Sequence, residues 1–437
     1  MAYVFRARSQ TSGSRPPRGG NGARTMNPWP VVLADLRALR WVAWIAPLLV
    51  AIAVSVGVAL SAQERGLRQA TAQAASDFDL LIGAPGSQTQ LVLTAVYLQP
   101  EALPLVDGAI LAALANDPRV KAAAPIAFGD VSRGYPIVGT TAAFVTRWGR
   151  IKPSEGRVFA REGEAVVGAD VRLAIGGAIT PSHAHAGQRH PIGTESSEEA
   201  RHRHEGVRYA VVGRLPRFGS PWDRAILVPV ESVWETHGLG NGHAAEDSPI
   251  GPPFDGARVP GVPAIVVKPN TVADAYVLRG QYRQGGTMAF FPAEVLVSVY
   301  RTLGDVRDLL LVAAVLNDVV VFAAVAILLL ALAGLRRRRY AVLRALGASR
   351  LYVILTAWLG AVAILAAGCA AGLALAQLTS LAVIHLIEAR TGLALPAAIA
   401  LPDALPIVGL MALGSLLALM PALAAFRIPV ADALRHG

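Results

Sequence analysis

Long apolar stretches alternate with polar and basic segments along this chain, and the longest have the length of membrane spans. Residues Trp41–Leu60 carry no charged side chain. Twenty helical residues rise about 30 Å, which matches the hydrocarbon core of a bilayer. Three further apolar stretches follow towards the C-terminus. We therefore expect transmembrane helices at 41–61, 309–335, 351–378 and 403–426.

The first apolar stretch has an alternative interpretation as a secretory signal peptide, because Ala59-Leu60-Ser61-Ala62 provides small residues for cleavage. Its apolar core is longer than that of a typical signal peptide, which favours a retained span. The segment 1–40 before it is rich in Arg, Ser, Gly and Pro as far as Thr25, a composition typical of disorder. From Pro30 to Arg40 the pattern predicts a short amphipathic helix on the membrane surface.

Segment 62–308 has a different pattern, which predicts a large mixed α/β domain between the first and second spans. Gln63–Leu81 and Pro292–Asp308 continue helically from the adjoining spans and would form a stalk. Asp107–Asn116 is a further predicted helix. Short β-rich runs bounded by Gly and Pro predict strands at 165–168, 209–213 and 225–229.

The distribution of charge sets the expected orientation in the membrane. Residues 336–350 contain six arginines, and no acidic residue occurs from Val319 to Ile387. Short loops rich in Lys and Arg stay cytoplasmic. The loop 336–350 and the tail 427–437 would then lie in the cytoplasm with the N-terminus, and 62–308 and the short loop 379–402 outside. We expect a multi-pass membrane protein, in contact with the membrane lipids, with both termini cytoplasmic.

The net charge of +10 in 437 residues does not indicate nucleic-acid binding, because the region between the first two spans is nearly neutral. There, from Ser61 to Asp318, 24 basic residues face 26 acidic ones. The excess of positive charge lies at the membrane flanks, as topology requires. The single cysteine, Cys369, excludes an intrachain disulfide.

No motif for catalysis or nucleotide binding is present in the sequence. The three lysines, Lys121, Lys152 and Lys268, do not stand in a P-loop, and there is no Gly-x-Ser-x-Gly or His-Glu-x-x-His. The chain is therefore not expected to be an enzyme, and ATP would have to be bound by a partner. A soluble enzyme domain behind a signal peptide would leave the three C-terminal spans unexplained.

Five of the nine histidines fall within 22 residues of the outer segment. Neutral imidazoles bind Zn²⁺, Cu²⁺ or Ni²⁺, and a flexible tract lets several of them converge on one ion. Two interpretations stay open, a metal site that captures zinc or a solvated polar loop. The candidate ligands are His183, His185, His190, His202 and His204.

Several segments resemble one known family. Residues 336–350 read Arg-Arg-Arg-Arg-Tyr-Ala-Val-Leu-Arg-Ala-Leu-Gly-Ala-Ser-Arg, and 421–435 begin Pro-Ala-Leu-Ala-Ala-Phe-Arg and end Ala-Leu-Arg. Both resemble the FtsX/MacB-type permeases of ABC transporters. So do Asp79–Ser87, Gly156–Phe159 and Gly219–Arg224, and the plan of one span, a large domain and three spans.

The resemblance implies a permease subunit that works as a homodimer or heterodimer with a separate ABC ATPase, which carries the ATP. The cytoplasmic loop would dock on that ATPase through a coupling helix, since Leu343 and Leu346 can share one helical face while Arg344 points elsewhere. In the family an acidic residue is common at the position of Arg339, so its salt bridge to the ATPase is not implied here. The candidate coupling residues are Arg339, Tyr340, Leu343, Arg344, Leu346 and Gly347.

Three further interpretations stay open at this stage. The arginines at 336–339 also suit simple anchoring to lipid phosphates. A division-type regulator that activates a cell-wall hydrolase shares the four-span plan, although its outer domain is much smaller. A membrane-anchored metal-binding or sensory protein without an ATPase would fit the histidines.

Overall fold

The computed structural model describes two compact parts of the chain, which are treated separately here. Unit 1 comprises 1–47, 324–367 and 411–437, and unit 2 comprises 48–323 and 368–410. The residues described are 27–38, 40–99, 101–183, 204, 206–245, 249–302, 304, 337–396, 399–420 and 423, with scattered residues between 312 and 334.

The described residues of unit 2 contain an eleven-stranded mixed sheet, which confirms the predicted mixed α/β domain. Along its main path the order is β11-β1-β10-β2-β3-β9-β5-β8-β4, with β6 beside β8 and β7 beside β2. The pairs β3–β9 and β5–β8 are parallel, and the others are antiparallel. The strands are β1 (Leu80–Gly83), β2 (Val120–Ser132), β3 (Tyr135–Thr140), β4 (Glu155–Gly156), β5 (Glu164–Val167), β6 (Ala178–Ile179), β7 (Ser182–His183), β8 (Tyr209–Arg214), β9 (Ile226–Pro229), β10 (Ala264–Pro269) and β11 (Met288–Phe290).

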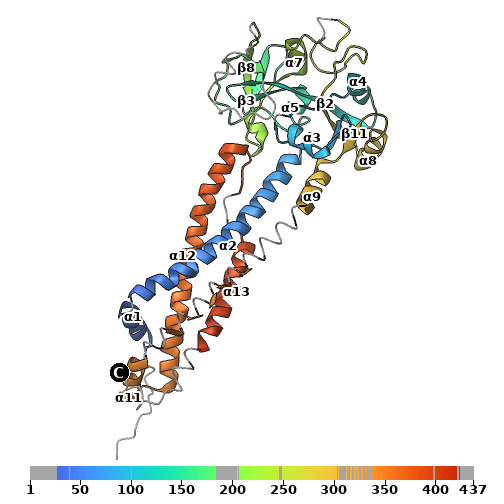
Figure 1. Ribbon diagram of the computed structural model, residues 1–437. Helices are drawn as coiled ribbons and strands as arrows, with labels where there is room; N and C mark the ends of the chain where they lie inside the picture. The colour runs from blue at the N-terminus through green and yellow to red at the C-terminus, as the bar shows by residue number, and fades with distance from the viewer. Residues whose placement is uncertain are drawn as a thin grey trace, which may run out of the picture. The chain divides into compact units, whose positions relative to one another are not determined.

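Both faces of this sheet are buried, because helices cover each of them (Figure 1). Leu80 and Ile82 of β1 belong to one apolar cluster, whereas Leu81 between them belongs to the other. This alternation follows from the two-residue period of a strand. The helices of the domain are α3 (Gln88–Ala95), α4 (Gly108–Ala115), α5 (Ala142–Val145), η1 (Pro221–Arg224), α7 (Val230–Thr236), α8 (Val272–Gln281) and α9 (Pro292–Thr302).

The helix predicted at 107–116 is confirmed together with its ends. Asp107 is the N-cap of α4, and its side chain accepts a hydrogen bond from the Ala109 amide at 2.9 Å. Asn116 is the C-cap. The predicted strands at 165–168, 209–213 and 225–229 are found as β5, β8 and β9.

The prediction that 63–81 is helical throughout is wrong at its end. Helix α2 (Arg40–Ala75) ends at Ala75, and Leu80–Gly83 form β1. Leu81 pairs with Val266 of β10 on one side and with Phe290 of β11 on the other. The backbone hydrogen bonds to β10 and β11 therefore make this segment a strand, although its apolar pattern also suits a helix.

Two described helices are long and apolar enough to cross a membrane, Trp44–Ala75 within α2 and α12 (Arg350–Thr391). Helix α12 extends beyond Leu378, where the apolar pattern ends, so 379–391 is helical rather than a loop. The fourth predicted span contains the shorter α13 (Leu401–Leu417). Of 309–335 the structure describes scattered residues in helix, and the number of four spans stays a prediction.

Unit 1 contains the short helices α1 (Trp29–Ala38) and α11 (Arg337–Ala345). The amphipathic helix expected at 30–40 is therefore present. Its Asp35 is buried rather than on a polar outer face, because Arg339 of α11 donates a hydrogen bond to its carboxylate at 3.1 Å. The predicted disordered tail lies outside the described residues.

Candidate metal centre

Four side chains that can bind a metal ion meet in unit 2. Asp130, His183, His204 and His237, together called the His/Asp cluster, each offer one ligand atom, and these atoms lie within 4.8 Å of one another. The four residues are far apart in the sequence. Asp130 lies in β2, His183 in β7 and His237 at the end of α7, and His204 lies outside the named elements. Tertiary folding alone brings them together.

Asp130 is the most deeply buried member of the cluster. It lies in β2, next to a register shift between Ala127 and Asp130 in the pairing with β3. Such irregularities re-aim side chains out of the regular ladder. Its side chain is only 1% exposed, and its Oδ2 has no hydrogen-bond partner among the described residues. Burial raises the pKa of the Asp130 carboxyl, and the positive charge of the three imidazoles opposes this shift.

His183 lies in the neighbouring strand β7, and His204 lies beside the start of that strand. In the pairing of β7 with β2, His183 stands directly opposite Asp130, and its Nδ1 lies 3.5 Å from Asp130 Oδ1. The His204 amide donates a hydrogen bond to the Pro181 carbonyl at 3.1 Å, which ties this residue to the start of β7. As a result His204 Nε2 lies 3.3 Å from the same oxygen.

His237 completes the cluster as the C-cap of α7. Its Nδ1 lies 2.8 Å from the Val233 carbonyl oxygen, so the ring carries its proton on that nitrogen when it is neutral. The lone pair of Nε2 then faces the cluster, where Nε2 lies 3.7 Å from Asp130 Oδ1. A backbone carbonyl that orients the second nitrogen is the usual partner of a metal-binding imidazole.

The three imidazole rings face one another at close range. Their centroids lie 4.2 Å apart for His183 and His204, 5.4 Å for His204 and His237, and 5.6 Å for His183 and His237. The side chains are partly open to solvent, at 48%, 17% and 28% exposed for His183, His204 and His237, so an ion can enter. Three nitrogen ligands and one carboxylate form a donor set that suits zinc.

The sequence singled out two members of this cluster and missed two. His183 and His204 come together, whereas His185, His190 and His202 lie outside the described residues. Asp130 and His237 were not predicted, since no spacing links them to the other two. Metal binding itself stays a prediction.

The predicted coupling residues lie on and just after α11. Tyr340 is buried, Leu343 and Arg344 are half-buried, and Leu346 is 80% exposed. Gly347 follows in the left-handed region with φ +95°, and its amide donates to the Arg344 carbonyl to end the helix. Arg339 is the partner of Asp35 described above.

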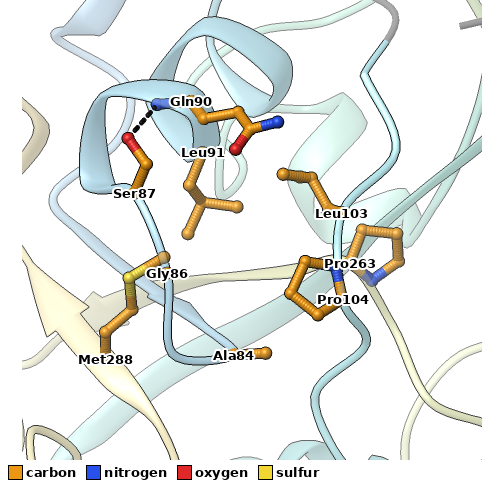
Figure 2. Close-up of a pocket in the computed structure, with 9 residues that line it drawn as sticks. All are labelled: Ala84, Gly86, Ser87, Gln90, Leu91, Leu103, Pro104, Pro263 and Met288. Carbon is orange, nitrogen blue, oxygen red and sulfur yellow. Dashed lines mark hydrogen bonds between the residues drawn. The ribbon is translucent and has the colours of Figure 1, made fainter.

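A small pocket lies where the chain turns from β1 into α3 (Figure 2). Ser87 is the N-cap of α3, and its hydroxyl accepts a hydrogen bond from the Gln90 amide at 3.2 Å. None of the lining residues is titratable, so the pocket offers no acid–base or metal chemistry. They are Ala84, Gly86, Ser87, Gln90, Leu91, Leu103, Pro104, Pro263 and Met288.

Comparison with known proteins points to one family. Residues 18–278 match the family described as MacB-like periplasmic core domain. No curated protein matches the chain.

Two solved structures are similar to parts of it. The periplasmic region of MacB from Actinobacillus actinomycetemcomitans is 9% identical with a TM-score of 0.32, over 52% of this chain and 94% of that one. The extracellular domain of the noncanonic ABC-type transporter YknZ from Gram-positive bacteria is 10% identical with a TM-score of 0.27, over 48% of this chain and 98% of that one. Because the family model matches residues 18–278, more than half of its length, the chain belongs to the FtsX/MacB-type family of ABC transporter permeases, whose members are multi-pass proteins of the inner membrane.

Proposed function

We propose that this chain is the transmembrane subunit of an ABC transporter and transmits movement from a separate ATPase to its extracytoplasmic domain. The family works with an ABC ATPase partner. In this proposal ATP binds to that partner, two permease copies form the transmembrane part, and both termini of each copy are cytoplasmic. The domain then does mechanical work on a peptide, lipoprotein or other exported substrate outside the membrane.

The observation that carries this proposal is the continuity of the long helices into the core of the domain. At about 1.5 Å per residue, the 36 residues of α2 and the 42 of α12 span about 54 Å and 63 Å, far more than the hydrocarbon core of about 30 Å. Their far ends are buried in the same apolar cluster, where Ala74 of α2, Ile384 of α12 and Val295 of α9 all pack. A displacement of either helix would therefore act directly on packed side chains.

Helices α2 and α9 are directly connected to two neighbouring strands of the sheet. Helix α2 leads into β1 and α9 leaves β11, and both leave the sheet on the same side (Figure 1). Because β1 and β11 are antiparallel with Leu81 opposite Phe290, the end of α2 and the start of α9 lie at one edge. The hydroxyls of Thr71 in α2 and Tyr300 in α9 form a hydrogen bond. This bond joins the two helices near the sheet.

The end of α12 is held by the segment Gly219–Arg224, one of those that resemble the family. Arg224 donates hydrogen bonds to the carbonyls of Glu388 and Ala389, two of the last carbonyls of the helix. The Ala394 amide donates to the Gly219 carbonyl at 3.1 Å. Charge-assisted bonds to helix C-terminal carbonyls are strong, so α12 and the domain should move together.

Helix α11, which precedes α12 in the chain, exposes apolar side chains that could contact the ATPase. Val342 is 44% exposed and Leu346 is 80% exposed, and residues four apart share one face of a helix. Leu343 is half-buried beside them, whereas Tyr340 and Ala341 pack inwards. We assign contact with the ATPase to Leu343 and Leu346, and a positioning role to Tyr340.

Co-purification tests the proposal. The full chain would be expressed with a candidate ABC ATPase partner, as wild type and as the double variant Leu343→Asp/Leu346→Asp. We expect the charged pair to abolish co-purification and the stimulation of ATP hydrolysis by the permease, since two carboxylates would have to enter an apolar groove. The matched control is Val277→Asp, which places the same charge at a 51% exposed valine of α8. Unchanged binding of the double variant would overturn the coupling role of this surface.

A further inference from the structure

We propose that the His/Asp cluster is a zinc site, in which Asp130, His183, His204 and His237 bind one Zn²⁺ per chain. The proposal goes beyond the transport role and does not depend on the identity of the ATPase. The ligands are those of a closed site, in which the protein supplies all four donors and the ion has a structural role.

The spacing of the donors fits a zinc tetrahedron. Zinc bonds of about 2.0–2.1 Å to nitrogen and oxygen place the ligand atoms of a regular tetrahedron about 3.4 Å apart. The three imidazole nitrogens lie 3.5, 3.3 and 3.7 Å from Asp130 Oδ1. Binding therefore requires adjustments of a few tenths of an ångström along these three edges. The edges between imidazole nitrogens are at most 4.8 Å, so the rings must also turn towards a common centre.

Asp130 gives an independent reason for a cation. A carboxylate that is 1% exposed and has one oxygen without a hydrogen-bond partner among the described residues is costly to bury. Among the residues that the structure describes, the basic side chains within 4 Å of its Oδ1 are the three histidines. One divalent cation would compensate the carboxylate and accept a lone pair from each neutral imidazole.

The orientation of His237 is already that of a ligand. Because Nδ1 is bonded to the Val233 carbonyl, rotation of the ring away from the cluster would break a 2.8 Å hydrogen bond. The donor set also argues against Mg²⁺ and Ca²⁺, which prefer six or more oxygen ligands. Among common divalent ions, zinc best suits a four-coordinate site of imidazoles and one carboxylate.

A zinc ion bound to these four residues would cross-link separate parts of the domain. It would join β2, β7 and the end of α7, and it would hold His183 and His204 on the two sides of segment 184–203. Because the unfolded chain lacks the assembled site, the free energy of binding would add to the stability of the folded domain.

Metal analysis of the full chain in detergent tests this site. Protein stripped with a chelator would be titrated with ZnCl₂ by calorimetry at pH 7.5, and its thermal unfolding followed with and without zinc. We expect one Zn²⁺ per chain with micromolar or tighter affinity and a higher Tm. Loss of a group that only orients a metal ligand typically costs about 10–100-fold in affinity. Loss of a ligand itself, in His237→Ala or Asp130→Asn, should therefore cost about 100-fold or more.

Two further variants make every outcome informative. His183→Ala removes a ligand that is 48% exposed, so its fold should persist and the loss of zinc can be read directly. The triple variant His185→Ala/His190→Ala/His202→Ala leaves the four ligands intact and should bind zinc like wild type. Loss of the stoichiometric ion in this triple variant alone would assign zinc to the histidine tract and overturn the site. Failure of the wild type to bind at micromolar zinc would show a hydrogen-bonded polar cluster only.

Discussion

Arg65 of α2 and Asp403 of α13 form a paired contact inside unit 2, with Nη2 2.6 Å from Oδ2 and Nε 3.4 Å from Oδ1. The Asp403 side chain is 4% exposed, and its Oδ2 also accepts the Ala400 amide at 2.8 Å. The Asp403 carboxylate thus accepts a hydrogen bond from the backbone at the start of α13 and also forms the ion pair with α2. Both residues lie next to apolar helical segments, where an unpaired charge would be especially costly.

Removal of Arg65 alone should destabilise the protein strongly. Arg65→Met would leave a buried carboxylate without its partner, at a cost of about 3–5 kcal/mol. The double variant Arg65→Met/Asp403→Asn should recover much of this loss, because it removes the uncompensated charge. Thermal unfolding in detergent measures both. Glu64→Ala breaks an exposed pair with Arg68 and serves as the control, with an effect of about 0.5 kcal/mol or less. Equal effects of Arg65→Met and Glu64→Ala would contradict the prediction.

Arg147 should be a second sensitive position, because its guanidinium is buried among aromatic rings. It lies 4.5 Å from the ring centre of Phe144, 5.0 Å from Phe218 and 5.1 Å from Trp222, and it pairs with Asp77 at 3.0 Å. Burial lowers the pKa of Arg147 to about 10, so the group stays charged at neutral pH.

Even Arg147→Lys should destabilise the domain, by about 2 kcal/mol. A compact ammonium cannot cover three rings at once and is more strongly hydrated than guanidinium. The matched control is Arg150→Ala, which removes the 55% exposed second partner of Asp77 and should cost about 1 kcal/mol or less. Chemical unfolding of the full chain in detergent compares the variants, and a lysine variant as stable as wild type would refute the argument.

The environment of Glu164 leads to a prediction of how the stability of the domain depends on pH at acidic values. Arg157 donates two hydrogen bonds to its carboxylate at 2.6 and 2.7 Å, and the Ala160 amide and Arg161 donate two more. These donors, Arg157 first, lower the pKa of Glu164 to about 2. A carboxyl with a lowered pKa in the folded state stabilises the fold above its usual pKa of about 4.5, and this contribution is lost as the pH falls towards 2.

Glu164→Gln should therefore lower stability at pH 7, by about 2 kcal/mol, and the difference from wild type should shrink between about pH 4.5 and pH 2. Thermal unfolding across this range provides the measurement. Glu155→Gln changes a 62% exposed carboxyl of β4 and is expected to have little effect at any pH. A difference for Glu164→Gln that does not vary with pH would show that shape, and not charge, matters there.

The elements that could be predicted from sequence are those whose ends are encoded locally. Helix α4 has Asp107 and Asn116 as caps, and the strands β5, β8 and β9 are short apolar runs between turn residues. Strand β1 could not be predicted in this way. Leu80 and Leu81 suit a helix as well as a strand, and partners in β10 and β11, far along the chain, decide between them.

The His/Asp cluster shows the same limit for a site. His183 and His204 attract notice because they lie in a histidine-rich tract. His237 follows the last residue of an ordinary helix, and Asp130 is one acid in a thirteen-residue strand. Only the register that sets His183 opposite Asp130, and the position at which α7 ends, make them neighbours. Neither the strand register nor the end of α7 can be inferred from the spacing of these residues in the sequence.

The position of β1 between β10 and β11 also has a consequence for biosynthesis. Gly83 pairs with Ala264 and Met288, so this early strand has no partner until the last strands have been made. The sheet can therefore close only after nearly the whole outer segment has been synthesised and translocated. Folding of such non-local pairings is slow, and we expect the exposed edges of β1 to depend on protection by chaperones during that interval.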